Sequence, residues 1–390
     1  MDGGTADSSS KPVSPVDTLI DVEELTQDVA SQPYTFTYQN GRRYASTDLG
    51  HYYMPNDRPE IHRLNEQHFV LTTAKGGSLH DTPLTKRDGF KILDIGCGSG
   101  IWCLQMAEDY PDAMIMGMDV SPVQPTSKPA NVEWIVPLDM EKEWPFAEDY
   151  FDFVHLSLVH GCVADWAAMM GKIVRHLAPG GFVEHQEFSL CRQYTLDLND
   201  QPMPMSDTLS DLPPLLRWGR LMEQAAEKRG RVLQLGPKLA SFQHSAGLQD
   251  VTEKVYRITT GTWPHDPQQR MLGARNMLSA LQGMEGFTTV MFTTALGWSL
   301  EDTRAFVEEV KRDLRDDGMR KVMDLHVVYG RKASSGGGAG DEEGTDTREA
   351  QRPEEAWKGL LGSWSVQFAG GMLAGAAIAS VMAMWLVQRR

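Results

Sequence analysis

The 390-residue sequence has few cysteines, and none of them is spaced like a metal or redox site. The four are Cys97, Cys103, Cys162 and Cys191, and no two form a C-x-x-C pair. Four thiols are too few for a disulfide scaffold, and the absent motif argues against a zinc site or a thioredoxin-like centre. No His, Cys and Asp cluster has metal-ligand spacing either, so we predict no metal.

Positive charge is also scarce. The chain has 37 basic and 53 acidic residues, which gives a formal charge of −16. Non-specific binding of nucleic acid needs a basic face, so nucleic acid is not an expected partner. The amino terminus has neither the basic nor the apolar stretch of a secretory signal, so no cleaved signal is expected.

Composition divides the chain into four parts. Residues 1–33 are acidic and rich in Ser, Pro and Gly, which predicts a disordered leader. Residues 34–332 alternate strand and helix patterns and predict one globular domain. Residues 333–355 contain mainly Gly, Ser and charged side chains and predict a disordered linker. The remainder differs from all three.

Residues 359–388 carry no formal charge, and their most apolar part is 364–387. As a helix this part would be about 36 Å long, against a hydrocarbon core of about 30 Å. We therefore expect a single C-terminal transmembrane helix that anchors a cytoplasmic domain to a membrane. Gly371, Gly375 and Ala379 lie four apart, which allows such helices to self-associate. The alternative is a core helix docked on the domain.

The most informative stretch combines a strand, a glycine loop and a helix. The apolar run 91–95 predicts a buried strand, and 101–109 predicts a helix. Between them, Gly96, Gly98 and Gly100 allow a ligand to approach bare backbone. The G-x-G-x-G spacing differs from the dinucleotide fingerprint G-x-G-x-x-G, and no Gly-Lys-Ser/Thr follows, so neither a dinucleotide site nor a Walker loop is predicted.

Three acids end successive predicted strands, at the edge where open α/β sheets bind ligands. Asp94 lies two residues before the first glycine, where a carboxylate would repel phosphate but suits a cationic amino-acid ligand. Asp119 ends the second strand and could take both hydroxyls of a ribose. Asp139 ends the third and is placed to accept from an adenine amine. A fourth strand (150–157) and a Pro-Gly-Gly turn into a fifth strand follow.

In this order, the motifs of residues 91–187 resemble those of class I S-adenosylmethionine-dependent methyltransferases. Flanking segments point to one family within this class. From about 34 to 332 the chain looks like the fungal LaeA-like (TAM domain) methyltransferases. The flanking segments are QNGRRY (39–44), EIHRLNEQH (60–68), TGTWP (260–264) and VVYGRK (327–332).

The resemblance implies an α/β fold: a Rossmann-like, doubly wound, seven-stranded methyltransferase sheet that is mostly parallel, with helices on both faces and a final antiparallel hairpin. It divides the domain into a cofactor half at about 90–187 and an acceptor-site insertion at about 188–300. Within the insertion, 215–229 predicts a helix that Gly230 ends.

The resemblance also assigns roles, with S-adenosylmethionine as cofactor. The three loop glycines shape the pocket, and Asp94 orients loop amides towards the methionine moiety. Asp119 holds the ribose and Asp139 the adenine, although either acid could instead be a plain helix cap. The Tyr44 and 52–57 segments could form a lid over the cofactor or simply pack.

An oxygen nucleophile usually needs a general base, whereas an amine need only lose its proton before it attacks. His160 follows the fourth strand, where the acceptor should arrive, so we rank it first as the catalytic residue. A purely structural histidine is the alternative. The other candidates near the strand ends are His155, Glu184, His185 and Glu187.

The sequence therefore suggests a methyltransferase that acts on O or N of a small molecule or peptide in fungal secondary-metabolite (mycotoxin) biosynthesis. The alternative is a LaeA-like regulator of secondary metabolism that acts through protein partners. A third hypothesis is a cofactor-binding scaffold without turnover.

Overall fold

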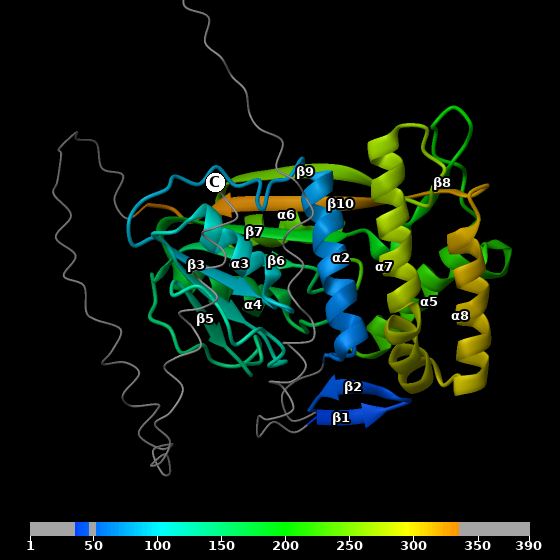
Figure 1. Ribbon diagram of the computed structural model, residues 1–390, viewed down its shortest axis with the longest axis horizontal. Helices are drawn as coiled ribbons and strands as arrows, with labels where there is room; N and C mark the ends of the chain where they lie inside the picture. Colours follow the sequence, from blue (N-terminus) through cyan, green and yellow to red (C-terminus); the bar gives the residue numbers. More distant parts are fainter. Residues whose placement is uncertain (1–35, 47–51, 335–390) are drawn as a thin grey trace, which may run out of the picture. The chain divides into compact units, whose positions relative to one another are not determined.

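Eight strands form one mixed sheet within residues 36–46 and 52–334, the parts of the chain that this computed structural model describes (Figure 1). The strands are β3 (Lys91–Ile95), β4 (Met114–Met118), β5 (Val132–Ile135), β6 (Phe151–Ser157), β7 (Leu177–Phe188), β8 (Tyr194–Leu196), β9 (Gln249–Thr260) and β10 (Arg320–Arg331). Their order is β5-β4-β3-β6-β7-β10-β8, and β9 also pairs with β10.

The sheet has a parallel and an antiparallel part. Strands β3 to β7 run parallel to one another, whereas β10 is antiparallel to β7, β8 and β9. β7 and β8 lie one after the other along the same edge of β10, since Leu325 pairs with Phe188 and Val322 with Tyr194. The parallel strands all end at one edge, where open α/β sheets bind their ligands.

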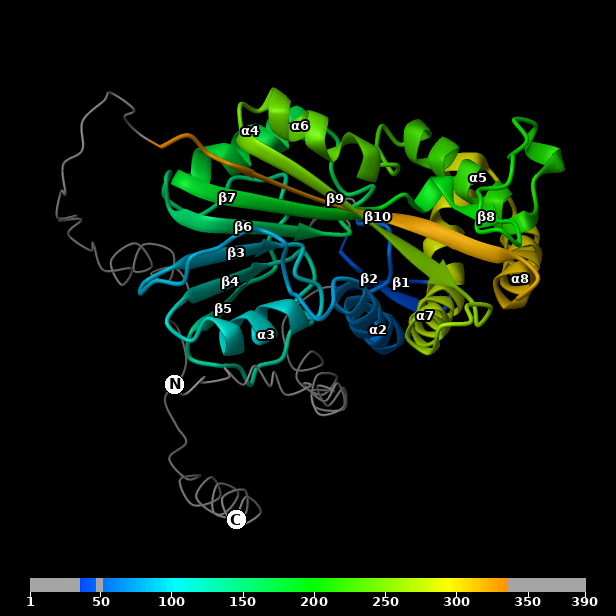
Figure 2. The same ribbon diagram turned by 90° about the horizontal axis from the view of Figure 1, so that it is seen from above.

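Helices cover both faces of this sheet and also form a separate layer. They are α2 (Arg58–Ala74), α3 (Ile101–Asp109), α4 (Trp166–His176), α5 (Pro214–Lys228), α6 (Leu239–Ser245), α7 (Pro267–Met291) and α8 (Leu300–Arg315). Figure 2 shows α4 and α6 on one face, and α3 and α2 on the other. Helices α5, α7 and α8 pack on one another beyond the carboxyl edge of the parallel strands.

Each of these two regions has its own hydrophobic core. One core lies around β3, β6 and α4 and includes Ile95, Leu156 and Ile173. The strands in it are buried almost continuously, as expected for parallel strands covered on both faces. The other core joins α5, α7 and α8 and includes Trp218 and Phe306. The helical layer is therefore packed in its own right.

A two-stranded hairpin, β1 (Phe36–Gln39) and β2 (Arg42–Ala45), is fastened to the start of α2. Arg42 donates to both carboxylate oxygens of Asp57, at 2.6 and 2.8 Å. Asp57 is also the N-cap of α2 and accepts from the amide of Glu60. The ion pair therefore fixes where α2 begins.

The strands and helices predicted around the glycine loop are confirmed, but two details of the sheet were wrong. The sheet has eight strands rather than seven, because the three-residue β8 is too short to give a period-two pattern. The two final antiparallel strands do not form a hairpin, because α7 and α8 lie between them in sequence.

The predicted C-terminal transmembrane helix, and with it the single-pass membrane anchor, is not supported. No helix among the described residues is long and apolar enough to cross a membrane. The longest of them, α7, has 25 residues but carries Arg270, Arg275 and Glu285. The segment 364–387, with the proposed pairing face of Gly371, Gly375 and Ala379, lies outside the described residues, as do the leader and nearly all of the linker.

Candidate active site

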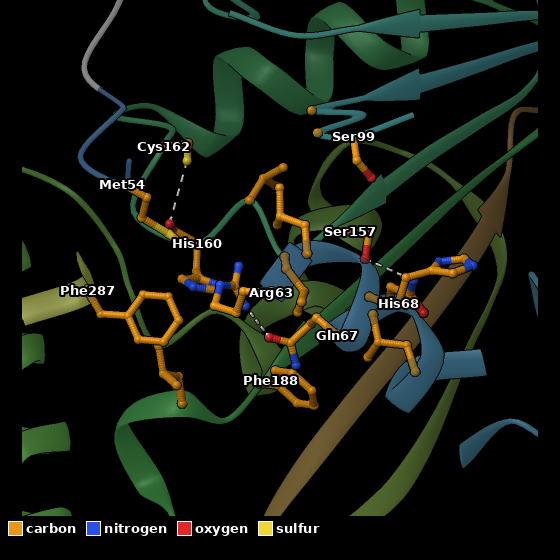
Figure 3. A pocket seen from close by; sticks show the side chains of 18 of the residues that line it. Met54, Arg63, Gln67, His68, Ser99, Ser157, His160, Cys162, Phe188 and Phe287 are labelled. Carbon is orange, nitrogen blue, oxygen red and sulfur yellow. Dashed lines mark hydrogen bonds between the residues drawn. The ribbon is translucent and has the colours of Figure 1, made fainter. Parts of the chain in front are cut away.

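A cavity lies at the carboxyl ends of β3, β4 and β6 and continues between α2, α5 and α7 (Figure 3). In Figure 3, Ser99, Ser157 and His68 lie on one side, and His160, Met54 and Phe287 on the other. The first side holds predicted cofactor residues, which include Asp94, Gly96, Gly98, Asp119 and Asp139. The second side is largely apolar and includes Met54, Phe188, Trp218, Met284 and Phe287.

The glycine loop is held against β4, and its glycines allow a ligand to approach the backbone of the loop closely. The amides of Gly96 and Cys97 donate to the Met118 carbonyl at 2.7 and 3.1 Å. Gly96 has φ of +74°, and a Cβ there would lie 2.8 Å from Val159. Gly96 and Gly98 line the cavity, and their contact with a cofactor stays a prediction.

Gly100 does not line the cavity; it packs on an aromatic ring behind it. It is the left-handed N-cap of α3, and a Cβ there would lie 2.5 Å from the Trp134 ring. Trp134 is itself fixed, because its indole N–H donates to the Pro125 carbonyl at 2.8 Å. Gly100 therefore sets the position of the loop from outside the pocket.

Asp119 connects the end of β4 to the glycine loop. Its carboxylate accepts from the Gly98 amide at 2.9 Å and from the Ser121 amide at 2.7 Å. Burial raises the pKa of Asp119 to about 6, although both amide hydrogen bonds act in the opposite direction. A carboxylate in this state gains from a ligand that brings hydroxyl donors to it.

The two other acids differ in their surroundings. Asp139 lines the cavity and accepts from the Glu141 amide at 2.9 Å, as a turn or cap residue does. Asp94 is buried and accepts from His155 Nδ1 at 2.7 Å, and the Cys103 thiol donates to it at 3.4 Å. These contacts differ from the loop-amide contacts that the resemblance implied for Asp94.

His155 lines the cavity and belongs to a buried group of polar side chains at the ends of β3, β6 and β7. Its ring stacks on Trp102 with 4.0 Å between centroids. Next to it, Gln186 donates to the Ser157 hydroxyl and accepts from the Lys75 ammonium, both at 3.0 Å. Burial lowers the pKa of Lys75. Asp94 and Trp102 thus hold His155 in place on the cofactor side, and it is not free to act as a base.

His160 lies in the loop after β6 and lines the cavity. Its Nδ1 is 3.0 Å from one oxygen of Glu187, and His185 Nε2 is 3.1 Å from the other. Burial raises the pKa of Glu187, but the hydrogen bonds from the two histidines outweigh it and hold that pKa below its ordinary value. Three of the five base candidates from the sequence therefore form one cluster.

Sequence reasoning missed the polar side chains that α2 contributes. Arg63 is buried, pairs with Glu60 at 2.8 Å and donates to Gln67 at 2.7 Å. Its guanidinium lies 4.9 Å from the centroid of the Phe287 ring on α7. Polar residues three and four apart, at 60, 63 and 67, were the available signal, but their burial and the helix that faces them cannot be read from spacing.

The residues of the first side fit S-adenosylmethionine, the cofactor expected from the sequence. Bare glycine backbone admits a ligand closely, and Asp94, Asp119 and Asp139 bring negative charge to a ligand with a positive sulfur. A ribose diol could donate to the Asp119 carboxylate and so replace the hydration that burial removes, the same burial that raises its pKa. Among the described residues, no group of three His, Cys, Asp or Glu side chains could hold a metal ion.

Comparison with known proteins agrees with this geometry. A family model described as a methyltransferase domain matches residues 43–230. The chain is 33% identical over 317 residues to Methyltransferase pytC of Aspergillus terreus, which covers 80% of this chain and 93% of that protein. It is 32% identical over 301 residues to Secondary metabolism regulator LAE1 of Cochliobolus heterostrophus, covering 75% and 94%. It is 28% identical over 304 residues to Protein-methionine methyltransferase laeA of Emericella nidulans, covering 77% and 78%. The chain therefore belongs to the LaeA-like family of S-adenosylmethionine-dependent methyltransferases, and S-adenosylmethionine is its cofactor.

Proposed function

We propose that this enzyme transfers a methyl group to an oxygen or nitrogen atom of a small molecule or peptide in fungal secondary metabolism. One observation carries the proposal: a single cavity joins the cofactor residues to a largely apolar chamber between α2, α5 and α7. Such a chamber suits a small apolar acceptor or one side chain of a peptide better than the surface of a folded protein.

On the cofactor side, Asp119 accepts from the ribose hydroxyls and Asp139 from the adenine amine. Gly96 and Gly98 admit the methionine moiety, and Asp94 acts through His155, which it holds against Trp102. Bound S-adenosylmethionine supplies an electrophilic methyl group on a positively charged sulfur. The protein's own contribution is to align the acceptor with that methyl and to exclude water, so positioning supplies much of the rate enhancement.

On the acceptor side, His160 is the proposed catalytic residue. It lines the chamber and has a carboxylate behind it, the arrangement of a general base. The other candidates are less suitable. His155 is held by Asp94 and Trp102, and Glu184 accepts from Asp81 and Thr82.

The alternative function is a regulator of secondary metabolism that acts through protein partners. It is supported by the names of relatives such as LAE1 of Cochliobolus heterostrophus. Another relative bears the name of a protein-methionine methyltransferase, which makes a protein acceptor the natural comparison for a test. The apolar chamber favours the small acceptor.

The test is to incubate the full-length protein with methyl-labelled S-adenosylmethionine and whole extract from a strain that lacks its gene. We expect label in the small-molecule and peptide fraction. Asp119→Ala, which removes a proposed cofactor contact, is the negative control, and calorimetry should show its weakened binding of S-adenosylmethionine. Label confined to proteins would contradict the proposal and favour the regulator.

A further inference from the structure

Glu187 occupies an unusual place on β7, because one fully buried carboxylate stands between two imidazoles. Its two oxygens lie 3.0 Å from His160 Nδ1 and 3.1 Å from His185 Nε2. His185 is also buried and stacks on Trp166 with 5.0 Å between ring centroids. Glu187 and His185 lie on β7 and His160 lies in the loop after the neighbouring strand β6, so their spacing is set by the sheet.

The hydrogen bonds define which nitrogen of His160 is basic. The two hydrogen bonds hold the pKa of Glu187 below its ordinary value, so its side chain is a carboxylate and can only accept. Nδ1 of His160 must therefore carry the ring proton. The lone pair of a neutral imidazole is then on Nε2, which is the nitrogen left for a group in the cavity.

The cluster contains a buried negative charge. With both imidazoles neutral, it carries one buried negative charge, and a proton on His160 would neutralise it. Nearby cations have other partners: Arg63 pairs with Glu60 and Arg231 with Glu141. Four other titratable groups lie around the cluster. Tyr53 precedes α2 and Asp119 follows β4. Cys162 lies in the loop after β6, and His326 lies on β10.

We propose that the acceptor is a hydroxyl compound, that His160 deprotonates it, and that Glu187 and His185 are positioning residues for His160. This inference rests on the proposed function and specifies its substrate class. The acceptor oxygen gives its proton to Nε2 and its electron pair to the methyl carbon, whose bond to sulfur breaks. The products are a methyl ether, a neutral thioether and an imidazolium held by Glu187, which later loses its proton to water.

A hydroxyl explains the cluster better than an amine does. An amine can lose its proton to water before it binds, so a buried base adds little to its methylation. A hydroxyl stays protonated near neutral pH and needs the base at the moment of attack. The apolar walls of Met54, Trp218, Met284 and Phe287 then suit the body of that hydroxyl compound.

The first test identifies the methylated atom. Extract from a gene-deleted strain is incubated with full-length protein and S-adenosylmethionine that carries a ¹³C methyl group, and the product methyl is assigned by NMR. A methyl on oxygen supports the inference. A methyl on nitrogen or carbon overturns the inference but is still consistent with a methyltransferase of small molecules. If neither small molecules nor peptides become labelled, the proposed function itself is contradicted.

The second test measures the positioning role, with the acceptor that the first test isolates. We expect Glu187→Gln to lower kcat about 10²-fold or more, with KM and cofactor affinity unchanged, because Nδ1 loses its carboxylate. The acid limb of its pH profile should move to lower pH, since the imidazolium loses its counter-charge. Glu187→Asp should restore part of the rate, and His185→Gln should cost about 10-fold.

A matched control and a direct spectroscopic readout complete the design. Glu253 makes a similar bond to His326 Nδ1, at 2.7 Å, between β9 and β10, and Glu253→Gln should leave kcat unchanged. Imidazole ¹⁵N NMR of the wild-type protein should show the ring proton of His160 on Nδ1. In Glu187→Gln, the same proton should exchange between Nδ1 and Nε2. Wild-type protein with the proton on Nε2, or Glu187→Gln with the wild-type kcat, would overturn the positioning role.

Discussion

The two sides of the cavity are built in opposite ways. The predicted cofactor residues come from one stretch of chain, between Asp94 and Asp139, in which each lies at or just beyond the carboxyl end of a parallel strand. The acceptor side brings together residues far apart in sequence, such as Arg63 on α2 and Phe287 on α7. The proposed cofactor residues are therefore positioned by the strands of one sheet, and the proposed acceptor residues by the packing of separate helices.

The difference implies that each side can be altered separately. The cofactor side shares its core with the sheet, whereas the acceptor side has the separate core of α5, α7 and α8. Loops and helices attached to a constant sheet are the usual route by which one fold serves many substrates. Substitutions in one core should therefore spare the ligand of the other side.

Trp218→Ala should have the largest effect, and it tests the independence of the helical core. Trp218 is 1% exposed, and its indole N–H donates to the Thr288 hydroxyl at 2.8 Å. Removing a buried tryptophan should lower the free energy of unfolding by about 3–5 kcal/mol, measured by chemical denaturation. Cofactor affinity of the folded protein should not change. Trp218→Phe, which keeps most of the volume, should lose about 1–2 kcal/mol; a weakened cofactor affinity in either variant would contradict the separation.

Asp94→Ala tests the opposite side, where stability and cofactor binding should fall together. The substitution leaves His155 buried without its acceptor, which should cost about 3 kcal/mol of unfolding free energy. Because His155 stacks on Trp102 at the first turn of α3, S-adenosylmethionine should also bind more weakly in calorimetry. Glu285→Ala, which breaks an exposed pair with Arg304, is the control and should cost less than about 1 kcal/mol.

Gly100→Ala separates the shape of the glycine loop from its backbone strain. A Cβ at Gly100 would overlap the Trp134 ring, so the loop must shift, and we expect a loss of cofactor binding energy of about 2 kcal/mol. Gly89→Ala is the matched control, since Gly89 also has a positive φ of +68° but has nothing within 4 Å of its Cβ position. Both variants should lose stability to strain, and equal cofactor affinities would disprove the role of Trp134.

Sequence reasoning succeeded where structure is local. The strand at Lys91–Ile95 and the helix at Ile101–Asp109 were predicted with the bounds that the structure has, because glycines interrupt the chain between them. It placed Asp119 at the cavity because a strand ends there. It missed the pairing of Asp94 with His155, since partners on neighbouring parallel strands depend on sheet order and register rather than on spacing along one strand.

The acceptor side could not be predicted to the same depth. His160 was chosen from its place after a strand, but its partner Glu187 was only one of several candidates, because their contact depends on the register of β6 against β7. The polar spacing along α2 was a signal for Arg63, but its contact with Phe287 could not be predicted, because that contact depends on how α2 packs against α7.

The smallest effect concerns pH and the cofactor side alone. Burial raises the pKa of Asp119 to about 6, so between pH 7 and pH 5 the carboxylate that we propose accepts from a ribose becomes mostly protonated. We expect calorimetry to show about tenfold weaker binding of S-adenosylmethionine at pH 5 than at pH 7. The stability of the unliganded protein should change in the opposite direction, because a raised carboxyl pKa stabilises the fold at low pH and that stabilisation is lost as pH rises through about 6. Asp119→Asn should remove both slopes, and an unchanged pH dependence in that variant would assign the titration to another group.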